Sequence, residues 1–442
     1  FWQRVLSDTH PPLYYLLMRE WFTAFGASDL SARLPSAIFG VLAVAAITPA
    51  FKSLSLRARL ALMLFLAASP GAIEYSQEAR SYSLLLFLSV VITGACWQFI
   101  RAQDAEGRDA TRALIVMTVA GVTASYTHYF GFLAAVAAGL TALTASFGNR
   151  RRGAAAVLSL AIIISLFLPW VGYHAHYLTR DSYGVRMSQW IATFPLDATI
   201  SWFIRLWLGG TAGLLSVATL AVAFLPMRSF RALVRRDAAW RVALLLPLVT
   251  IAAALAISSY TPVLTSRNLI VILPALYLAM AAFAEFGATR WGNLAMATGL
   301  GATLLLMMQP LPWYYTAQSK EQWRESAAVV LAQPGCRSGA IYVYGDAANY
   351  HALIDKDRPR LQLVEIPLGG GPVPPLASPA DCSVLLWAAD LPRAKFDSVL
   401  AALPADLACV RVEALYWAFV AVREPTVSPG RGGCEPTSAS GP

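Results

Sequence analysis

The sequence predicts an α-helical polytopic membrane protein with a small α/β domain outside the membrane near its C-terminus. Of its 442 residues, 57% are hydrophobic and only 13% are charged, and the mean hydropathy is +0.55. Soluble globular proteins carry roughly 25% charged residues. The composition therefore excludes a cytosolic enzyme, a secreted disulfide scaffold and a disordered chain.

Ten apolar segments are long enough, with ragged ends, to cross the ~30 Å hydrocarbon core of a bilayer. They are residues 35–51, 59–73, 82–100, 113–127, 130–147, 154–172, 207–226, 241–258, 268–286 and 293–311. A further helix is expected from His10 to about residue 25, with a Pro-Pro pair in its first turn. Because Arg19 and Glu20 interrupt it, we expect this helix to lie in the membrane interface rather than to cross.

The net charge of +9 indicates membrane topology rather than nucleic-acid binding, because the arginines stand in short clusters between the apolar segments. One set of alternating connections holds 15 Lys and Arg residues, and the other set holds five. The richer set lies at residues 52–59, 101–112, 150–152, 228–241 and 290. The positive-inside rule places this set in the cytoplasm. Residues 1–34 and everything after 311 are then expected to face outward.

From about residue 312 the composition becomes that of a soluble domain. Strands are expected at 340–344, 361–366, 383–387, 410–413 and 416–422, and helices at 320–331 and 393–402. Alternating strands and helices predict a small α/β domain. The expected organisation is an outer juxtamembrane segment (1–34), a transmembrane domain (35–311), an extracytoplasmic α/β domain (312–425) and a disordered tail (426–442).

Four of the five cysteines lie in the expected outer domain, at Cys336, Cys382, Cys409 and Cys434, while Cys96 lies in a span. Four cysteines in an oxidising compartment permit two disulfides with three possible pairings. We expect at least one bridge, joining Cys336 to Cys382 or Cys409 to Cys434.

All five histidines fall in segments expected outside, and four of them lie at membrane ends, which locates the function on the outer face. His174 and His176 are two residues apart and would point to opposite sides of a helix, so no metal site is expected. We expect no cofactor either. His10 begins the interfacial helix, either as part of a helix without chemistry or as a group that binds an anion or acceptor. His128 and Tyr129 stand in a very short outer turn.

Glu74 and Glu78 are four residues apart, so on a continuing helix they would share a face, with Arg80 just beyond. One interpretation is that these acids are solvated or neutralise Arg80 and Arg33. The other is an anion clamp for a phosphate, for which the forked donors of arginine are suited.

Five motifs occur in order along the chain. They are Asp8-Thr-His-Pro-Pro-Leu-Tyr-Tyr, Ala32-Arg33-Leu-Pro-Ser, Tyr75-Ser-Gln-Glu-Ala-Arg-Ser-Tyr, Thr127-His-Tyr-Phe-Gly and Arg267-Asn-Leu with a Pro at 274. This order resembles the GT-C glycosyltransferases of family 39 type, over most of residues 1–315. That group includes protein O-mannosyltransferases, the aminoarabinose transferase that acts on lipid A, and bacterial galacturonosyl and mannosyl relatives.

The resemblance implies a multi-pass protein of the bacterial inner membrane. It also implies sugar transfer with inversion of configuration at the anomeric carbon. Its partners would be a polyprenyl-phosphate sugar donor, a lipid, glycan or protein acceptor, and membrane lipids, with no nucleic acid. Transfer would take place on the outer face. The alternative is a polytopic transporter or flippase. Transporters place charges near the midplane, whereas the spans here are nearly free of charge, which favours the enzyme.

The reaction that the resemblance implies needs groups that contact the donor phosphate and the substrate. His10, Arg80, His128, Tyr129 and Arg267 are the expected donor-phosphate and substrate contacts. In the family the catalytic carboxylate follows the first span, a point expected upstream of Phe1, so the general base stays unassigned. Asp8 and then Glu78 are the acids that would take this role if no upstream residue does. We expect residues 1–442 alone to bind donor lipid without turning it over.

Overall fold

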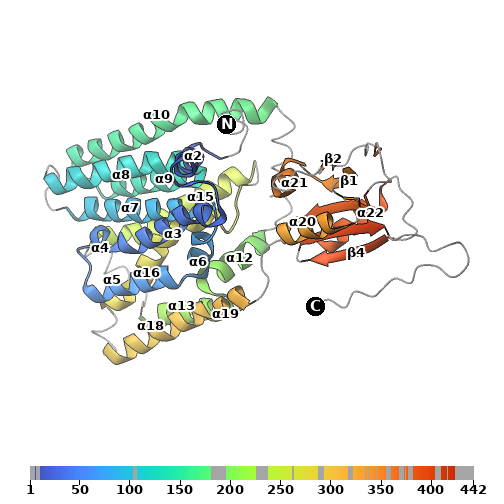
Figure 1. Cartoon of the computed structure of the whole chain (residues 1–442). Helices are drawn as coiled ribbons and strands as arrows, with labels where there is room; N and C mark the ends of the chain where they lie inside the picture. Colours follow the sequence, from blue (N-terminus) through green and yellow to red (C-terminus); the bar gives the residue numbers. More distant parts are fainter. Residues whose placement is uncertain are drawn as a thin grey trace, which may run out of the picture. The chain divides into compact units, whose positions relative to one another are not determined.

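The computed structural model divides by internal contacts into a helical unit, residues 1–312, and a smaller unit, residues 313–442 (Figure 1). The structure describes residues 5, 10–102, 107–180, 196–224, 237–260, 263–286, 293–316, 322–333, 335–336, 338–345, 347–354, 360–367, 373, 375–376, 382–403, 410–415 and 417–423.

Helices make up the first unit, as the apolar segments predict. They are α2 (Leu13–Phe25), α3 (Asp29–Ala45), α4 (Ile47–Ala50), α5 (Leu56–Ala68), α6 (Pro70–Ser76), α7 (Tyr82–Arg101), α8 (Arg108–Thr127), α9 (Tyr129–Thr144), α10 (Arg150–Arg180), α12 (Leu196–Leu208), α13 (Thr211–Phe224), η1 (Ala238–Trp240), α15 (Arg241–Ser258), η2 (Asn268–Ile272), α16 (Leu273–Phe286), α18 (Asn293–Met308) and α19 (Pro310–Thr316). Each of the ten expected segments overlaps at least one of these helices.

The number of spans is lower than ten when length and composition are applied to the described residues. Six helices are long and apolar enough to cross a membrane, and the number rises to eight if each of two bent pairs is one span. The bent pairs are α5 with α6, at 60°, and α12 with α13, at 74°. The segment 113–127 falls in α8, which carries Arg112 and several threonines, and 130–147 falls in α9, which has only 16 residues. The chain is a multi-pass membrane protein, and the count of ten is not reached by this measure.

The core of the helical unit lies around α7. This helix packs against α3, α8 and α9, and most of its side chains are buried. Trp97 and Cys96 are fully buried near its C-terminal end. Gly94 lets α4 approach closely, because a Cβ at this position would lie 2.4 Å from the Cβ of Ala50. A helix that is apolar on nearly all sides is therefore enclosed by its neighbours.

The arginine-rich connections meet at one end of the helical unit. The Arg101 guanidinium donates to Asp237 Oδ2 at 2.5 Å, and Arg152 donates to the Ala102 carbonyl at 3.2 Å. These four residues come from three of the connections that the charge rule groups together. Three of the five arginine-rich connections that the charge rule groups together thus lie side by side. We call the opposite end, which holds His10 and His128, the polar end.

The second unit is a mixed five-stranded sheet with helices on both faces. Its strands are β1 (Ser338–Tyr344), β2 (Arg360–Ile366), β3 (Val384–Ala389), β4 (Val410–Leu415) and β5 (Ala418–Arg423), in the order β2-β1-β3-β5-β4. The first three strands are parallel, and β5 runs antiparallel to β3 and β4. All five expected strands are thus confirmed.

Each face of the sheet has its own apolar core. The first contains Tyr350 and Trp387 and is covered by α20 (Trp323–Ala332) and α21 (Ala347–Ile354). The second contains Phe396 and Phe419 and is covered by α22 (Arg393–Ala401). Helix α21 is not predicted by the sequence pattern. Its eight residues begin with Ala-Ala-Asn and show too little periodicity to predict a helix.

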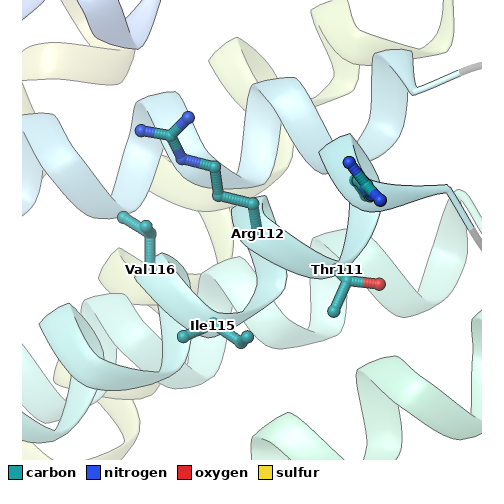
Figure 2. Close-up of a pocket in the computed structure, with 5 residues that line it drawn as sticks. Thr111, Arg112, Ile115 and Val116 are labelled. Carbon is teal, nitrogen blue, oxygen red and sulfur yellow. The ribbon is translucent and has the colours of Figure 1, made fainter.

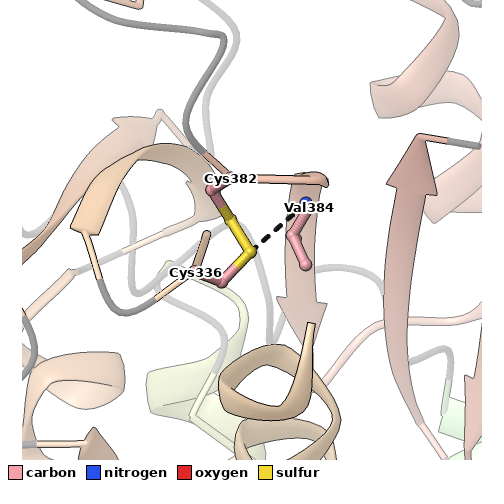
Figure 3. Close-up of a disulfide and its surroundings, with 3 residues drawn as sticks. All are labelled: Cys336, Cys382 and Val384. Carbon is pink, nitrogen blue, oxygen red and sulfur yellow. Dashed lines mark hydrogen bonds between the residues drawn. A yellow bond between two sulfur atoms is a disulfide. The ribbon is translucent and has the colours of Figure 1, made fainter. Parts of the chain in front are cut away.

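A disulfide joins Cys336 to Cys382 with a Cα–Cα distance of 4.4 Å (Figure 3). The two cysteines immediately precede the neighbouring strands β1 and β3, so the bridge ties together the starts of two parallel strands. The Val384 N–H donates to Cys336 Sγ at 3.5 Å. One expected pairing is therefore confirmed, while Cys409 and Cys434 lie outside the described residues.

Candidate functional site

A single residue, His128, connects α8 to α9 at the polar end. Its backbone is extended, with φ −164° and ψ 145°. Its Nδ1 accepts a hydrogen bond from the Phe130 N–H at 3.1 Å, which caps the start of α9. The turn is tight because Gly131 faces the last turn of α8, where a Cβ would lie 2.2 Å from the Ala124 carbonyl oxygen. The Thr-His-Tyr-Phe-Gly motif thus encodes a one-residue turn between two antiparallel helices.

Replacing Gly131 by alanine is expected to destabilise the helical unit by roughly 1–3 kcal/mol, because the α8 and α9 backbones must separate to admit the methyl group. A thermal unfolding series in detergent measures this loss. Gly172→Ala in α10 is the matched control, since a Cβ there meets no atom within 4 Å. Equal melting temperatures for the two variants would contradict the close approach at Gly131.

The His128 side chain is only 4% exposed and lies among polar rings. Its ring centroid is 5.4 Å from that of His10 and 5.8 Å from that of Tyr82. Burial, together with His10 and Arg267, lowers the pKa of His128 from 6.5 to about 3, so the ring is neutral at ordinary pH. Since Nδ1 is an acceptor, a neutral ring carries its proton on Nε2. His128 therefore presents one N–H donor toward its surroundings.

Arg267 stands at the start of η2, far away in sequence from His128. Its loop is held by Trp207, whose Nε1–H donates to the Ser266 carbonyl at 2.9 Å. Arg267 is close enough to interact electrostatically with His128, Tyr82 and Tyr75. The structure thus brings His10 and Arg267 close to the His128 ring. We call this group the His–Arg cluster.

Arg80 lies at the edge of this cluster. Its carbonyl accepts a hydrogen bond from Ser36 Oγ at 3.2 Å, and it interacts electrostatically with Tyr82. Its side chain is 57% exposed, and its Nε lies 3.7 Å from Glu78 Oε2. Of the two arginines among the expected donor-phosphate contacts, Arg80 is thus more exposed than Arg267 and has an acid beside it.

The expectation that Glu74 and Glu78 share a helical face is wrong. Helix α6 ends at Ser76, and the chain bends through Glu78 before α7 begins. The helix stops because residues 77–81 turn the chain, with the Gln77 N–H bonded to the Glu74 carbonyl. Glu78 is consequently directed to its neighbour Arg80. Asp8 lies outside the described residues.

Tyr129 belongs to a second polar group, beside the His–Arg cluster. Its hydroxyl accepts a hydrogen bond from Trp170 Nε1–H at 3.2 Å and is bonded to His174 Nδ1. The His174 ring is buried and stacks against both partners, at interplanar angles of 15° and 19°. Tyr129 is thus engaged with α10, and His174 joins the site as a member that was not among the expected substrate contacts. In the described part of the chain, no three His, Cys, Asp or Glu residues are arranged to hold a metal ion.

Replacing His128 by asparagine is expected to make stability less sensitive to acid. Because the pKa of His128 falls from 6.5 on folding, only the unfolded chain binds its proton between pH 6.5 and about 3. Stability is then lost as pH falls, by about 1.4 kcal/mol per pH unit for one proton. Asparagine keeps an oxygen to cap Phe130 but does not titrate. Melting temperatures of the two proteins from pH 7 to pH 5 should diverge, and parallel curves would contradict a buried neutral His128.

Comparisons with known proteins give a family match over part of the chain and a fold match over most of it. Residues 9–173 match a family model described as dolichyl-phosphate-mannose-protein mannosyltransferase. The fold is similar to the crystal structure of ArnT from Cupriavidus metallidurans in the apo state, with a TM-score of 0.51 and 15% identity over 93% of this chain and 87% of that chain. The undecaprenyl phosphate-bound structure of that ArnT gives a TM-score of 0.48 with the same identity and coverage. A search of curated proteins finds no match.

The family model covers three of the five motifs and all but the first residue of a fourth, and the fold match extends over both units. These findings confirm the resemblance stated from the sequence. The chain is a helical membrane protein whose fold is similar to that of ArnT, and residues 9–173 resemble the mannosyltransferase family.

Proposed function

We propose that this chain is an integral-membrane glycosyltransferase that moves a sugar from a polyprenyl-phosphate donor to a lipid, glycan or protein acceptor on the outer face of the membrane. The observation that carries the proposal is the His–Arg cluster, which gathers a guanidinium and a buried neutral imidazole donor at one end of the helical unit. The family model, whose description names a dolichyl-phosphate sugar, supports the class of donor.

The His–Arg cluster is suited to stabilise the lipid phosphate as it leaves the sugar. In an inverting displacement the acceptor hydroxyl oxygen attacks the anomeric carbon, and the bond from that carbon to the phosphate oxygen breaks. The phosphate leaves with the electron pair, and its growing negative charge is stabilised by fixed donors. Arg267 would supply a forked cation and His128 an Nε2–H, with His10 beside them. The proton of the acceptor passes to a carboxylate that we do not assign.

A neutral His128 is useful in this role. A donor that is already desolvated and oriented costs little reorganisation when charge develops on the phosphate. Its lowered pKa keeps it in one protonation state across the physiological range. Activity between pH 6 and 8 should then not depend on the titration of His128.

Sugar transfer is tested with the full-length protein in proteoliposomes, supplied with radiolabelled mannosyl, galacturonosyl and aminoarabinosyl polyprenyl phosphates. The proposal requires label to leave at least one donor and appear on an acceptor lipid, glycan or protein added from a cell-envelope extract. Release of polyprenyl phosphate is measured in parallel. If labelled donor crosses the bilayer intact and no bond is broken, the chain is a transporter or flippase instead.

The face of the membrane is tested by single cysteines in a background whose Cys409 and Cys434 are serine. A cysteine placed within residues 148–153 should be shielded from an impermeant thiol reagent added to intact cells. One placed near residue 345 should be labelled, because the charge rule puts the second unit outside. The reverse labelling pattern would contradict the proposed orientation in the membrane and would leave the proposed sugar transfer untested.

A further inference from the structure

A shallow hollow of about 360 Å³ lies on the surface of α8, at the arginine-rich end and remote from the His–Arg cluster (Figure 2). It is lined by Arg108, Thr111, Arg112, Ile115 and Val116. All five come from one helix, at spacings of three to four residues, so they share a face. Polar side chains stand at the N-terminal end of this face, and apolar ones follow.

The positive charge of the hollow is not neutralised within the described part of the chain. Arg108 and Arg112 lie one helical turn apart, a spacing at which like charges repel. Neither makes an ion pair with any described residue, including Asp109, which lies three residues before Arg112. Two forked cations held together at an exposed site favour an anion with several oxygens, such as a phosphate.

The face continues from the arginines as exposed apolar surface. Ile115 is 57% exposed and Val119, one turn further, is 61% exposed. Helix α8 packs against α7 and α10, both long and apolar enough to cross a membrane. Its exposed face therefore runs from the headgroup level into the hydrocarbon region. A free anion would use only the first part of this face, whereas a lipid uses all of it.

We propose that this hollow binds an anionic phospholipid, with its phosphate between Arg108 and Arg112 and an acyl chain along Ile115 and Val119. Thr111 adds a hydroxyl donor at the same level. The site is independent of the proposed glycosyl transfer, because it lies at the opposite end of α8 from His128. Its function would be to fix the arginine-rich end of the helical unit at the level of the headgroups.

The test uses the full chain in nanodiscs of phosphatidylcholine with 30% phosphatidylglycerol, followed by native mass spectrometry of the lipids that stay bound. Each arginine near an anionic surface contributes about a fivefold gain in affinity. The R108Q/R112Q variant is therefore expected to retain phosphatidylglycerol roughly 10- to 30-fold more weakly than the wild type. R150Q is the matched control, since Arg150 is an exposed arginine at the same end but outside the hollow.

Equal retention by wild type and R108Q/R112Q would overturn the proposal, as would an equal loss in R150Q, which would indicate a general charge effect. If the double variant does not fold, a photo-crosslinking residue at position 111 gives the answer in an otherwise wild-type chain. Crosslinks to phosphatidylglycerol over phosphatidylcholine are expected, and equal crosslinking to both would overturn the site. Displacement of phosphatidylglycerol by millimolar inorganic phosphate would show a free-anion site and likewise reject the lipid.

Discussion

Replacing Arg267 by alanine is expected to lower the rate of donor-dependent sugar transfer roughly 10- to 150-fold. The guanidinium is the described cation that reaches both His128 and Tyr82, and losing a hydrogen bond to a charged group costs about 1.5–3 kcal/mol. Arg267→Lys should restore part of the rate, because lysine keeps the charge and loses the fork. The measurement is transfer from labelled polyprenyl-phosphate sugar by the full-length protein in proteoliposomes at several donor concentrations.

Two comparisons make this result specific. Arg80→Ala should cost less than Arg267→Ala, because Arg80 is more than half exposed and has Glu78 beside it. Arg33→Ala, which removes an exposed arginine from α3, should leave the rate within twofold of the wild type. Wild-type transfer with normal donor dependence in the Arg267→Ala protein would remove Arg267 from the proposed phosphate site.

Removing the Cys336–Cys382 bridge is expected to destabilise the second unit by about 2–4 kcal/mol. The bridge closes a loop with a sequence separation of 46 residues, which restricts the unfolded chain, and it joins the starts of β1 and β3. The Cys336→Ser/Cys382→Ser protein should therefore lose the protease resistance of residues 313–442 at a lower urea concentration than the wild type. A reducing agent should shift the wild type in the same way and should shift the double variant less. No shift of the wild type on reduction would contradict a stabilising bridge.

Local patterns predicted most of the fold. The strands of the second unit were predictable because each is a short apolar run bounded by polar or turn residues. Helix α21 was not predictable from the sequence, because it is short and is held by tertiary packing. Its Tyr350 packs against the sheet and donates a hydrogen bond from its hydroxyl to the Tyr344 carbonyl at 2.8 Å. The end of α6 at Ser76 was also missed, because a helical spacing of two glutamates does not reveal where a helix stops.

The site was only partly predictable because its members meet through packing. Charge counting grouped the connections that hold His10, His128 and Arg267, but it cannot tell which side chains touch. His128 and Tyr129 are adjacent in sequence yet face different partners, since one caps α9 and the other bonds to His174, 45 residues away. Local sequence does not encode such a division.

The central claim is that the His–Arg cluster holds the phosphate of the donor lipid, and solid-state NMR tests it most directly. The chain is labelled with ¹⁵N-histidine, reconstituted with polyprenyl phosphate, and examined by ¹⁵N–³¹P dipolar recoupling. The chain has five histidines, so His128→Asn identifies its signal by difference. The account predicts that the His128 Nε2 signal is dephased by ³¹P, as expected for a hydrogen bond of about 2.8 Å to a phosphate oxygen. A bound lipid that leaves the His128 signal unchanged would contradict it.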